Sequence, residues 1–220
     1  MKIAIIGTGN VGQAIGGSLV RAGHTVTFAA RDGATTRQVA AAAGASASAS
    51  PADAARGAEV IILAVPYLAA EQVAAELDGQ AAGKVVIDAT NPIKADYSGL
   101  STEAAGSGAE RFAQLLEGAH VVKAFNTLFA SVQADPGGHG SALDLLYATD
   151  DASAKAVVIA LASSLGLRPV SVGPLAASRE LEAMAWLNIR LQMISGGDWR
   201  STFVLVDAPA AATAAEVATT

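Results

Sequence analysis

Cysteine is absent from this sequence of 220 residues, which excludes disulfides, thiolate metal ligands and cysteine nucleophiles. Charged residues are scarce, at 15% of the chain, and no basic patch accompanies the net charge of −6, so nucleic-acid binding is not expected. The histidines His24, His120 and His139 do not have the spacing of a metal site, and we expect no bound metal. Few side chains are therefore available for acid–base or metal chemistry.

Long hydrophobic runs are also missing, although the mean hydropathy is high at +0.40. The longest apolar runs, such as residues 60–66 and 156–162, are far shorter than the roughly 18 residues that span a bilayer. The first residues lead directly into a strand pattern and lack the basic-then-apolar layout of an export signal. We therefore expect a cytoplasmic protein that does not contact a membrane.

Short apolar runs that predict buried strands alternate with helical patterns along the chain. This alternation is typical of a parallel α/β sheet, and we predict a Rossmann-type, doubly wound, mainly parallel sheet with a small C-terminal helical extension. The predicted strands cover 2–6, 25–29, 60–65, 84–89, 120–125, 143–148 and 168–172, and the predicted helices cover 11–22, 35–44, 68–77, 109–116, 152–165 and 174–194.

The remaining segments are less regular. Residues 45–50 predict a short strand and loop, followed by a helix start with Ser50 as N-cap and Pro51 in the first turn. Residues 91–109 predict a long loop, and residues 203–206 a small edge strand. The Ala/Thr-rich tail at 208–220 has no apolar period, and we expect it to be frayed.

A glycine-rich motif follows the first predicted strand and opens the first predicted helix. The sequence G-x-G-x-x-G in this context predicts a dinucleotide site, in which the glycines allow a tight turn, close approach of a pyrophosphate and close helix packing. The helix N-terminus supplies N–H groups to the phosphates. The predicted cofactor-binding residues here are Gly7, Thr8, Gly9, Asn10, Val11 and Gly12.

The end of the second predicted strand bears on the choice between NAD and NADP. An NAD site usually has an acidic residue there, whereas this strand ends at Ala30 and Arg31. An arginine can bind a 2′-phosphate with two hydrogen bonds, so we predict NADP(H) and assign Ala30 and Arg31 to its site. Asp32 leaves the use of NAD open, and residues 35–37 are either phosphate contacts or an ordinary helix start. Residues 1–207 are then a single NADP-binding domain.

The carboxyl ends of later strands line the same crevice in a doubly wound sheet. Val65 and Pro66 end one strand and are expected to face the cofactor with their backbone. Asn91 follows the next strand, either as a hydrogen-bond partner of the nicotinamide or ribose or as a turn former. Asn126 and Thr127 present polar groups after the strand beyond it.

Four stretches together carry a family resemblance: 6–12, Val65-Pro66 with 88–92, 122–127, and the segment from 166 to 179. Over about residues 1–194 the chain resembles the NADP oxidoreductases dependent on coenzyme F420, a 5-deazaflavin. It is also similar to the oxidoreductase domain of the six-transmembrane epithelial antigen ferrireductases. The resemblance implies hydride transfer between NADPH and a flavin-like ring. Where this chain has Asn126, F420 enzymes tend to carry histidine, so the acceptor stays open between F420 and an ordinary flavin, FMN or FAD.

No catalytic side chain is assigned, because hydride transfer between two aligned rings needs little acid–base help. Two other functions stay open: an NADPH-dependent reductase of a small imine or carbonyl substrate, and a non-enzymatic NADP-sensing protein. The Tyr-x-x-x-Lys pair of short-chain reductases is missing. About 48 residues follow the strand at 168–172, too few for the helical second domain of the imine reductases.

The last predicted helix, 174–194, carries apolar residues over more than one core-facing stripe. We predict that a homodimer buries part of it and completes the acceptor site. Glu180 and Glu182 on this helix are expected to be solvated, whereas Arg179 is a possible contact for an acidic cofactor.

Overall fold

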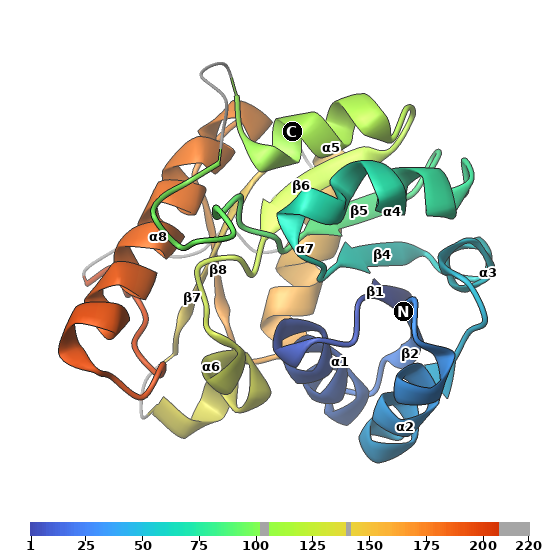
Figure 1. Cartoon of the computed structure of the whole chain (residues 1–220), viewed down its shortest axis with the longest axis horizontal. Coiled ribbons are helices and arrows are strands. Elements are labelled where there is room, and N and C mark those ends of the chain that lie inside the picture. The colour runs from blue at the N-terminus through green and yellow to red at the C-terminus, as the bar shows by residue number, and fades with distance from the viewer. Residues whose placement is uncertain (102–105, 140–141, 207–220) are drawn as a thin grey trace.

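The computed structural model describes residues 1–101, 106–139 and 142–206. Within these ranges the strands form one eight-stranded sheet in the order β3-β2-β1-β4-β5-β6-β7-β8, with helices on both faces (Figure 1). Neighbouring strands run parallel except β6 and β7, which are antiparallel. The predicted fold class is confirmed, and the tail predicted to be frayed lies outside the described residues.

The predicted strands up to residue 172 are confirmed, and their ends differ by at most two residues from the observed ones. Because a parallel strand is covered by helices on both faces, its residues are almost all apolar, which is why these runs could be recognised. The strands are β1 (Lys2–Ile6), β2 (Thr25–Ala29), β3 (Ser46–Ala47), β4 (Val60–Leu63), β5 (Val85–Asp88), β6 (His120–Ala124), β7 (Asp144–Ala148) and β8 (Arg168–Ser171).

The predicted helices are also present, and α6 is an additional short helix that the sequence does not predict. Ser50 caps α3 as expected, since its hydroxyl accepts from the Asp53 N–H at 3.1 Å. Among the described residues, no helix has the length and apolar character needed to cross a membrane. The helices are α1 (Asn10–Arg21), α2 (Gly33–Ala43), α3 (Pro51–Arg56), α4 (Ala70–Leu77), α5 (Gly108–Leu115), α6 (Ala130–Ala134), α7 (Ala152–Ser164) and α8 (Ser178–Ser195).

The sheet separates the core into two layers, because successive side chains of a strand point to opposite faces. Ile3 and Ile5 of β1 pack into the layer that includes residues of α1 and α7. Ala4 and Ile6 pack into the layer that includes residues of α4 and α5. The strand order diverges at β1, with β2 on one side and β4 on the other, and this is the point where doubly wound sheets bind ligands.

The edge strand predicted at 203–206 is wrong, because this segment does not pair with the sheet. The Leu205 N–H donates to Asp144 Oδ2 at 2.6 Å, and Arg168 Nη2 donates to the Leu205 carbonyl at 2.6 Å. Side chains of β7 and β8 therefore satisfy the backbone groups that a strand ladder would otherwise have used.

Candidate functional site

The turn between β1 and α1 has room for a side chain at only one of its three motif glycines. Gly7 has a φ of +120°, and a Cβ there would lie 2.1 Å from the Ala64 carbonyl oxygen; at Gly12 it would lie 2.2 Å from the Gly7 carbonyl oxygen. At Gly9 a Cβ would meet nothing within 4 Å. No side chain caps α1 at Gly9, so this helix N-terminus faces open space with the donors that bind a phosphate.

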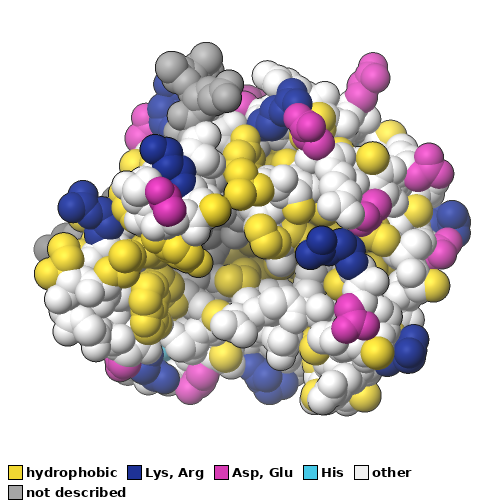
Figure 2. Space-filling view, viewed as in Figure 1, with side chains coloured by type: hydrophobic (Ala, Val, Ile, Leu, Met, Phe, Trp, Pro, Cys, Tyr) yellow, Lys and Arg dark blue, Asp and Glu magenta, His cyan; other side chains and the backbone are white. Residues whose placement is uncertain are grey.

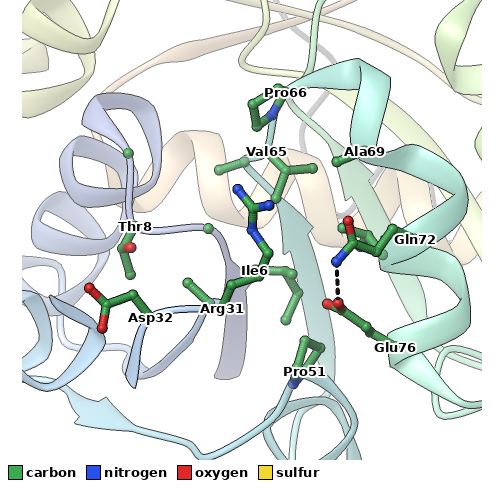
Figure 3. Close-up of a pocket in the computed structure, with 15 residues that line it drawn as sticks. Ile6, Thr8, Arg31, Asp32, Pro51, Val65, Pro66, Ala69, Gln72 and Glu76 are labelled. Atoms are coloured by element: carbon green, nitrogen blue, oxygen red, sulfur yellow. Dashed lines mark hydrogen bonds between the residues drawn. The ribbon is translucent and has the colours of Figure 1, made fainter. Parts of the chain in front are cut away.

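One cavity of about 520 Å³ opens beside this turn, between the carboxyl ends of β1, β2 and β4 and the helix α4. Figure 3 shows Arg31 reaching into it from the end of β2, with Gln72 and Glu76 facing it from α4. Gln72 Nε2 donates to Glu76 Oε1 at 2.7 Å. Apolar side chains make up much of the rest of the lining: Ile6, Pro51, Ala64, Val65, Pro66, Ala69 and Val73.

Asp32, beside Arg31, is occupied as the N-cap of α2. Its carboxylate accepts from the Thr35 hydroxyl at 2.6 Å and from the Ala34 N–H at 2.9 Å. Hydrogen bonds from the hydroxyl and N–H of Thr35 and from the N–H of Ala34 hold the pKa of Asp32 below its usual range. The Thr36 hydroxyl donates to the Asp32 carbonyl at 2.7 Å. Thr35 and Thr36 thus form part of the start of α2, as one of the two alternatives from the sequence expects.

A second cavity, of about 880 Å³, lies on the other side of the α1 N-terminus. Its described lining residues are all uncharged, and they come mainly from the β5 and β6 ends, α6, α8 and the chain after α8. In Figure 2 hydrophobic side chains gather around a hollow between α8 and the centre of the molecule. The cavity therefore suits a large, flat, mainly apolar group better than a small charged one.

Asn91 and Asn126, predicted separately at two strand ends, form a reciprocal pair at this second cavity. Asn91 Nδ2 donates to the Asn126 carbonyl at 2.9 Å, and Asn126 Nδ2 donates to Asn91 Oδ1 at 2.9 Å. Asn126 Oδ1 is buried and accepts no hydrogen bond from the described part of the chain. A buried acceptor without a donor is costly.

The predicted site residues divide between the two cavities, apart from Gly12, which packs against Gly7. The first is lined by Gly7, Thr8, Gly9, Ala30, Arg31, Val65 and Pro66. The second is lined by Asn10, Val11, Asn91, Asn126 and Thr127.

A buried ionic cluster behind the second cavity was not predicted from the sequence. Lys123 Nζ lies 2.8 Å from Asp88 Oδ2 and 2.9 Å from Glu182 Oε1, and these side chains are 0 to 1% exposed. The expectation that Glu182 is solvated is therefore wrong: it faces Lys123 and also accepts from the Gly108 N–H at 2.9 Å. A lysine within the apolar strand pattern at 120–125 was the available signal.

The cluster fixes the backbone next to Asn91. Lys123 Nζ donates to the Thr90 carbonyl at 2.6 Å, and Asp88 Oδ1 accepts from the Thr90 N–H at 2.8 Å. Burial alone would lower the pKa of Lys123, but the carboxylates of Asp88 and Glu182 reverse this effect and raise it. Burial raises the pKa of Glu182, against the opposing attraction of Lys123.

The family model described as NADP oxidoreductase, coenzyme F420-dependent, matches residues 2–92. An F420-dependent NADP reductase of Methanothermobacter marburgensis is 34% identical over 211 residues, which cover 88% of this chain and 93% of the relative. The chain belongs to this family. Membership confirms the resemblance drawn from the motifs, and with it the class of NADP-dependent oxidoreductases.

Two further proteins are similar to this member of the F420-dependent NADP oxidoreductase family. A solved structure from Arthrobacter sp. FB24, a candidate F420-dependent NADP reductase, superposes with a TM-score of 0.84 at 30% identity, over 94% of this chain and 100% of that one. The rat metalloreductase STEAP3 is 30% identical over 188 residues, which are 83% of this chain and 36% of that protein.

Proposed function

We propose that this protein transfers a hydride between NADP(H) and coenzyme F420. The observation that carries the proposal is the pair of cavities on either side of the α1 N-terminus: one contains Arg31, and the other is wide and uncharged among its described lining residues. The relative from M. marburgensis, which is named for this reaction, supports the choice of both substrates.

The first cavity fits the adenosine and phosphate end of NADP(H). The open position at Gly9 leaves space for the pyrophosphate against the helix N-terminus. Arg31 supplies a cation for the 2′-phosphate, and Asp32 is engaged in capping α2. In this proposal Thr8, Ala30, Val65 and Pro66 complete the wall of the site.

The second cavity fits the nicotinamide and the acceptor ring. Asn10 and Val11 lie at its border with the phosphate turn. Asn91 and Asn126 place amide side chains on its wall, and amides can hydrogen-bond the carboxamide of a nicotinamide. Asn91 holds Asn126 in place, and Thr127 adds a further polar group on the same wall.

When both substrates are bound, a hydride passes from C4 of the reduced nicotinamide to C5 of the deazaflavin, and a proton from solvent completes the reduction. The protein aligns the rings and excludes water from between them. The absence of charged groups among the described residues of the second cavity agrees with a reaction that needs no side-chain acid or base.

An acceptor screen tests the proposal. NADPH is mixed with the protein and, in separate reactions, with F420, FMN, FAD or a cyclic imine, and the absorbance of both reactants is followed. We expect oxidation of NADPH with F420, in equal amounts. Turnover with FMN or FAD alone, or with the imine alone, would reject F420 as the acceptor. Tight NADPH binding without turnover with any of them would favour an NADP-sensing protein.

We also propose that the protein is a homodimer through α8. Leu187, Leu191 and Ile194 are 51%, 48% and 78% exposed, and their spacing places them on one face of the helix. An apolar stripe along a helix is self-complementary about a two-fold axis, so a second copy of the chain is its natural partner. Because Met193 of α8 lines the second cavity, the dimer contact would lie next to the acceptor site.

A further inference from the structure

The α4 wall of the first cavity presents a hydrogen-bonded pair that the phosphate contacts do not use. Gln72 and Glu76 lie one turn apart on the helix face toward the cavity, opposite Arg31 (Figure 3). A carboxylate only accepts hydrogen bonds, so the 2.7 Å contact between Gln72 Nε2 and Glu76 Oε1 fixes which end of the amide faces Glu76. The amide oxygen of Gln72 is directed away from Glu76 (Figure 3).

The pair therefore offers a definite pattern of groups to a ligand. Gln72 presents its amide oxygen and its second N–H, and Glu76 presents its other carboxylate oxygen, Oε2. An amide with this orientation matches adenine, whose exocyclic amine donates while the adjacent ring nitrogen accepts. Hypoxanthine has an oxygen in place of the amine. This oxygen cannot donate a hydrogen bond, and its lone pairs would be repelled by the Gln72 amide oxygen and by Glu76 Oε2.

The rest of the cavity suits a purine ring. Ile6, Pro51 and Val73 provide apolar contacts, and the guanidinium of Arg31 can stack on an aromatic face. The other polar side chains in the lining are committed elsewhere: Thr8 lies in the phosphate turn, and Asp32 caps α2. The edge of a base that faces α4 meets Gln72 and Glu76.

We propose that Gln72 and Glu76 read the exocyclic amine of the adenine and make this protein selective for adenine dinucleotides over their hypoxanthine analogues. Gln72 makes the contact, and Glu76 both accepts from the amine and fixes the Gln72 amide. The inference rests on the proposed function only in taking the ligand of this cavity to be NADP(H).

The test compares binding of NADPH and of its hypoxanthine analogue by the nicotinamide fluorescence. The wild-type protein is expected to bind NADPH about 10-fold more tightly, a typical effect of a base-reading hydrogen-bond pair. Gln72→Ala and Glu76→Ala are expected to bring this ratio close to one. Glu76→Gln, which can donate to the hypoxanthine oxygen, is expected to favour the analogue relative to wild type.

Glu71→Ala is the matched control, because Glu71 lies on the same helix but pairs with Arg111 at 2.6 Å outside the cavity lining; it is expected to keep the wild-type ratio. Equal binding of NADPH and the analogue by the wild type would overturn this inference alone. The same ratio in wild type, Gln72→Ala and Glu76→Ala would overturn it as well. Failure of the wild type to bind NADPH at all would overturn the proposed function together with it.

Discussion

Gly9 and Gly12 lie in the same turn, but a side chain at each would meet different surroundings. A Cβ at Gly9 projects into open space, whereas one at Gly12 would collide with the backbone oxygen of Gly7. We expect Gly9→Val to fold normally and to bind NADPH at least about 100-fold more weakly, since the side chain would occupy the pyrophosphate position. Gly12→Ala is expected to lose about 2 kcal/mol or more of stability. Fluorescence titration and thermal unfolding separate the two effects, and retained binding by Gly9→Val would contradict the assignment of the turn.

Arg31 is the residue that should distinguish NADPH from NADH. We expect Arg31→Ala to weaken NADPH binding by about 10- to 100-fold, as for loss of a charged hydrogen-bond partner. NADH, which loses only the stacking contact with its adenine, should be weakened far less. Arg56→Ala is the control, because Arg56 pairs with Asp53 at 2.6 Å on an exposed surface. Equal weakening of both dinucleotides, measured by titration, would show that Arg31 does not bind the 2′-phosphate.

The buried cluster contains two carboxyl groups and one ammonium, so its members should respond differently to substitution. Lys123→Met leaves Asp88 and Glu182 buried without a cation, and we expect it to destabilise the fold by about 3–5 kcal/mol. Glu182→Gln keeps the pair of Lys123 and Asp88 and should cost clearly less. Urea unfolding measures both, and an equal loss of stability would mean that the cluster does not act through its charge balance.

Among the single residues, the sequence predicted those whose place depends on local backbone geometry. Gly7 and Gly12 follow from a motif in which a side chain is sterically excluded, and Arg31 follows from its position at a strand end. Glu182 could not be predicted, because its burial depends on Lys123 and on the Gly108 N–H, which are remote in sequence. The pairing of Asn91 with Asn126 likewise depends on the neighbouring positions of β5 and β6.

Among the elements, α7 has a titratable cap whose contribution depends on pH. Partial burial opposes the charge of Asp151, but hydrogen bonds from Ser153, the Ala154 N–H and His120 lower the pKa of Asp151 to about 2. A carboxyl whose pKa is lower in the folded state stabilises the fold above its unfolded pKa of 3.8, and this contribution is lost as the pH falls toward about 2.

We therefore expect Asp151→Ala to lose about 1 kcal/mol of stability near neutral pH, as for the loss of an N-cap. The difference from wild type should shrink as the pH falls below about 4, where the Asp151 carboxyl of the unfolded chain begins to protonate while that of the folded chain is still ionised. Urea unfolding at several pH values measures this, with the exposed Asp53 in the first turn of α3 replaced by alanine in a parallel variant for comparison. A difference that stayed constant down to about pH 2 would contradict the assigned pKa.

The elements that the sequence predicted are those with a strong hydrophobic period. The strands appear as continuous apolar runs because both of their faces are covered. The short helix α6 spans only Ala130–Ala134, too few residues to display a helical period. The strand expected at 203–206 fails because Asp144 and Arg168 bind the backbone of Leu205 instead.

For the whole molecule, the exposed stripe on α8 predicts the oligomeric state. We expect a dimer by light scattering, and we expect Leu191→Glu to give a monomer because it places a charge within the apolar contact. Glu180→Lys, which changes the charge elsewhere on the same helix, is the control and should remain dimeric. A wild-type monomer at micromolar concentration would refute the dimer.

The topology of the sheet divides the site into two cavities. The sequence predicted this doubly wound topology from the alternation of strands and helices. The glycine turn follows β1, where the strand order diverges, so the cavities open on its two sides. The outer wall of the second cavity was not predictable. After α8 the chain turns back, and the Trp199 ring packs edge-on against Phe129 with ring centres 5.3 Å apart. This contact depends on the turn at Gly196, where α8 ends.

We propose that the hydride passes directly between NADP(H) and a deazaflavin at the junction of the two cavities. This transfer is tested most directly with NADPH that carries deuterium on the transferred position of nicotinamide C4, mixed with F420 and the protein and followed by mass spectrometry. We predict that reduced F420 gains one deuterium at C5, where a carbon-bound label does not exchange with water, and that Gly9→Val abolishes this transfer. Reduced F420 without the label, or no reduction while NADPH is bound, would contradict direct transfer between the two rings.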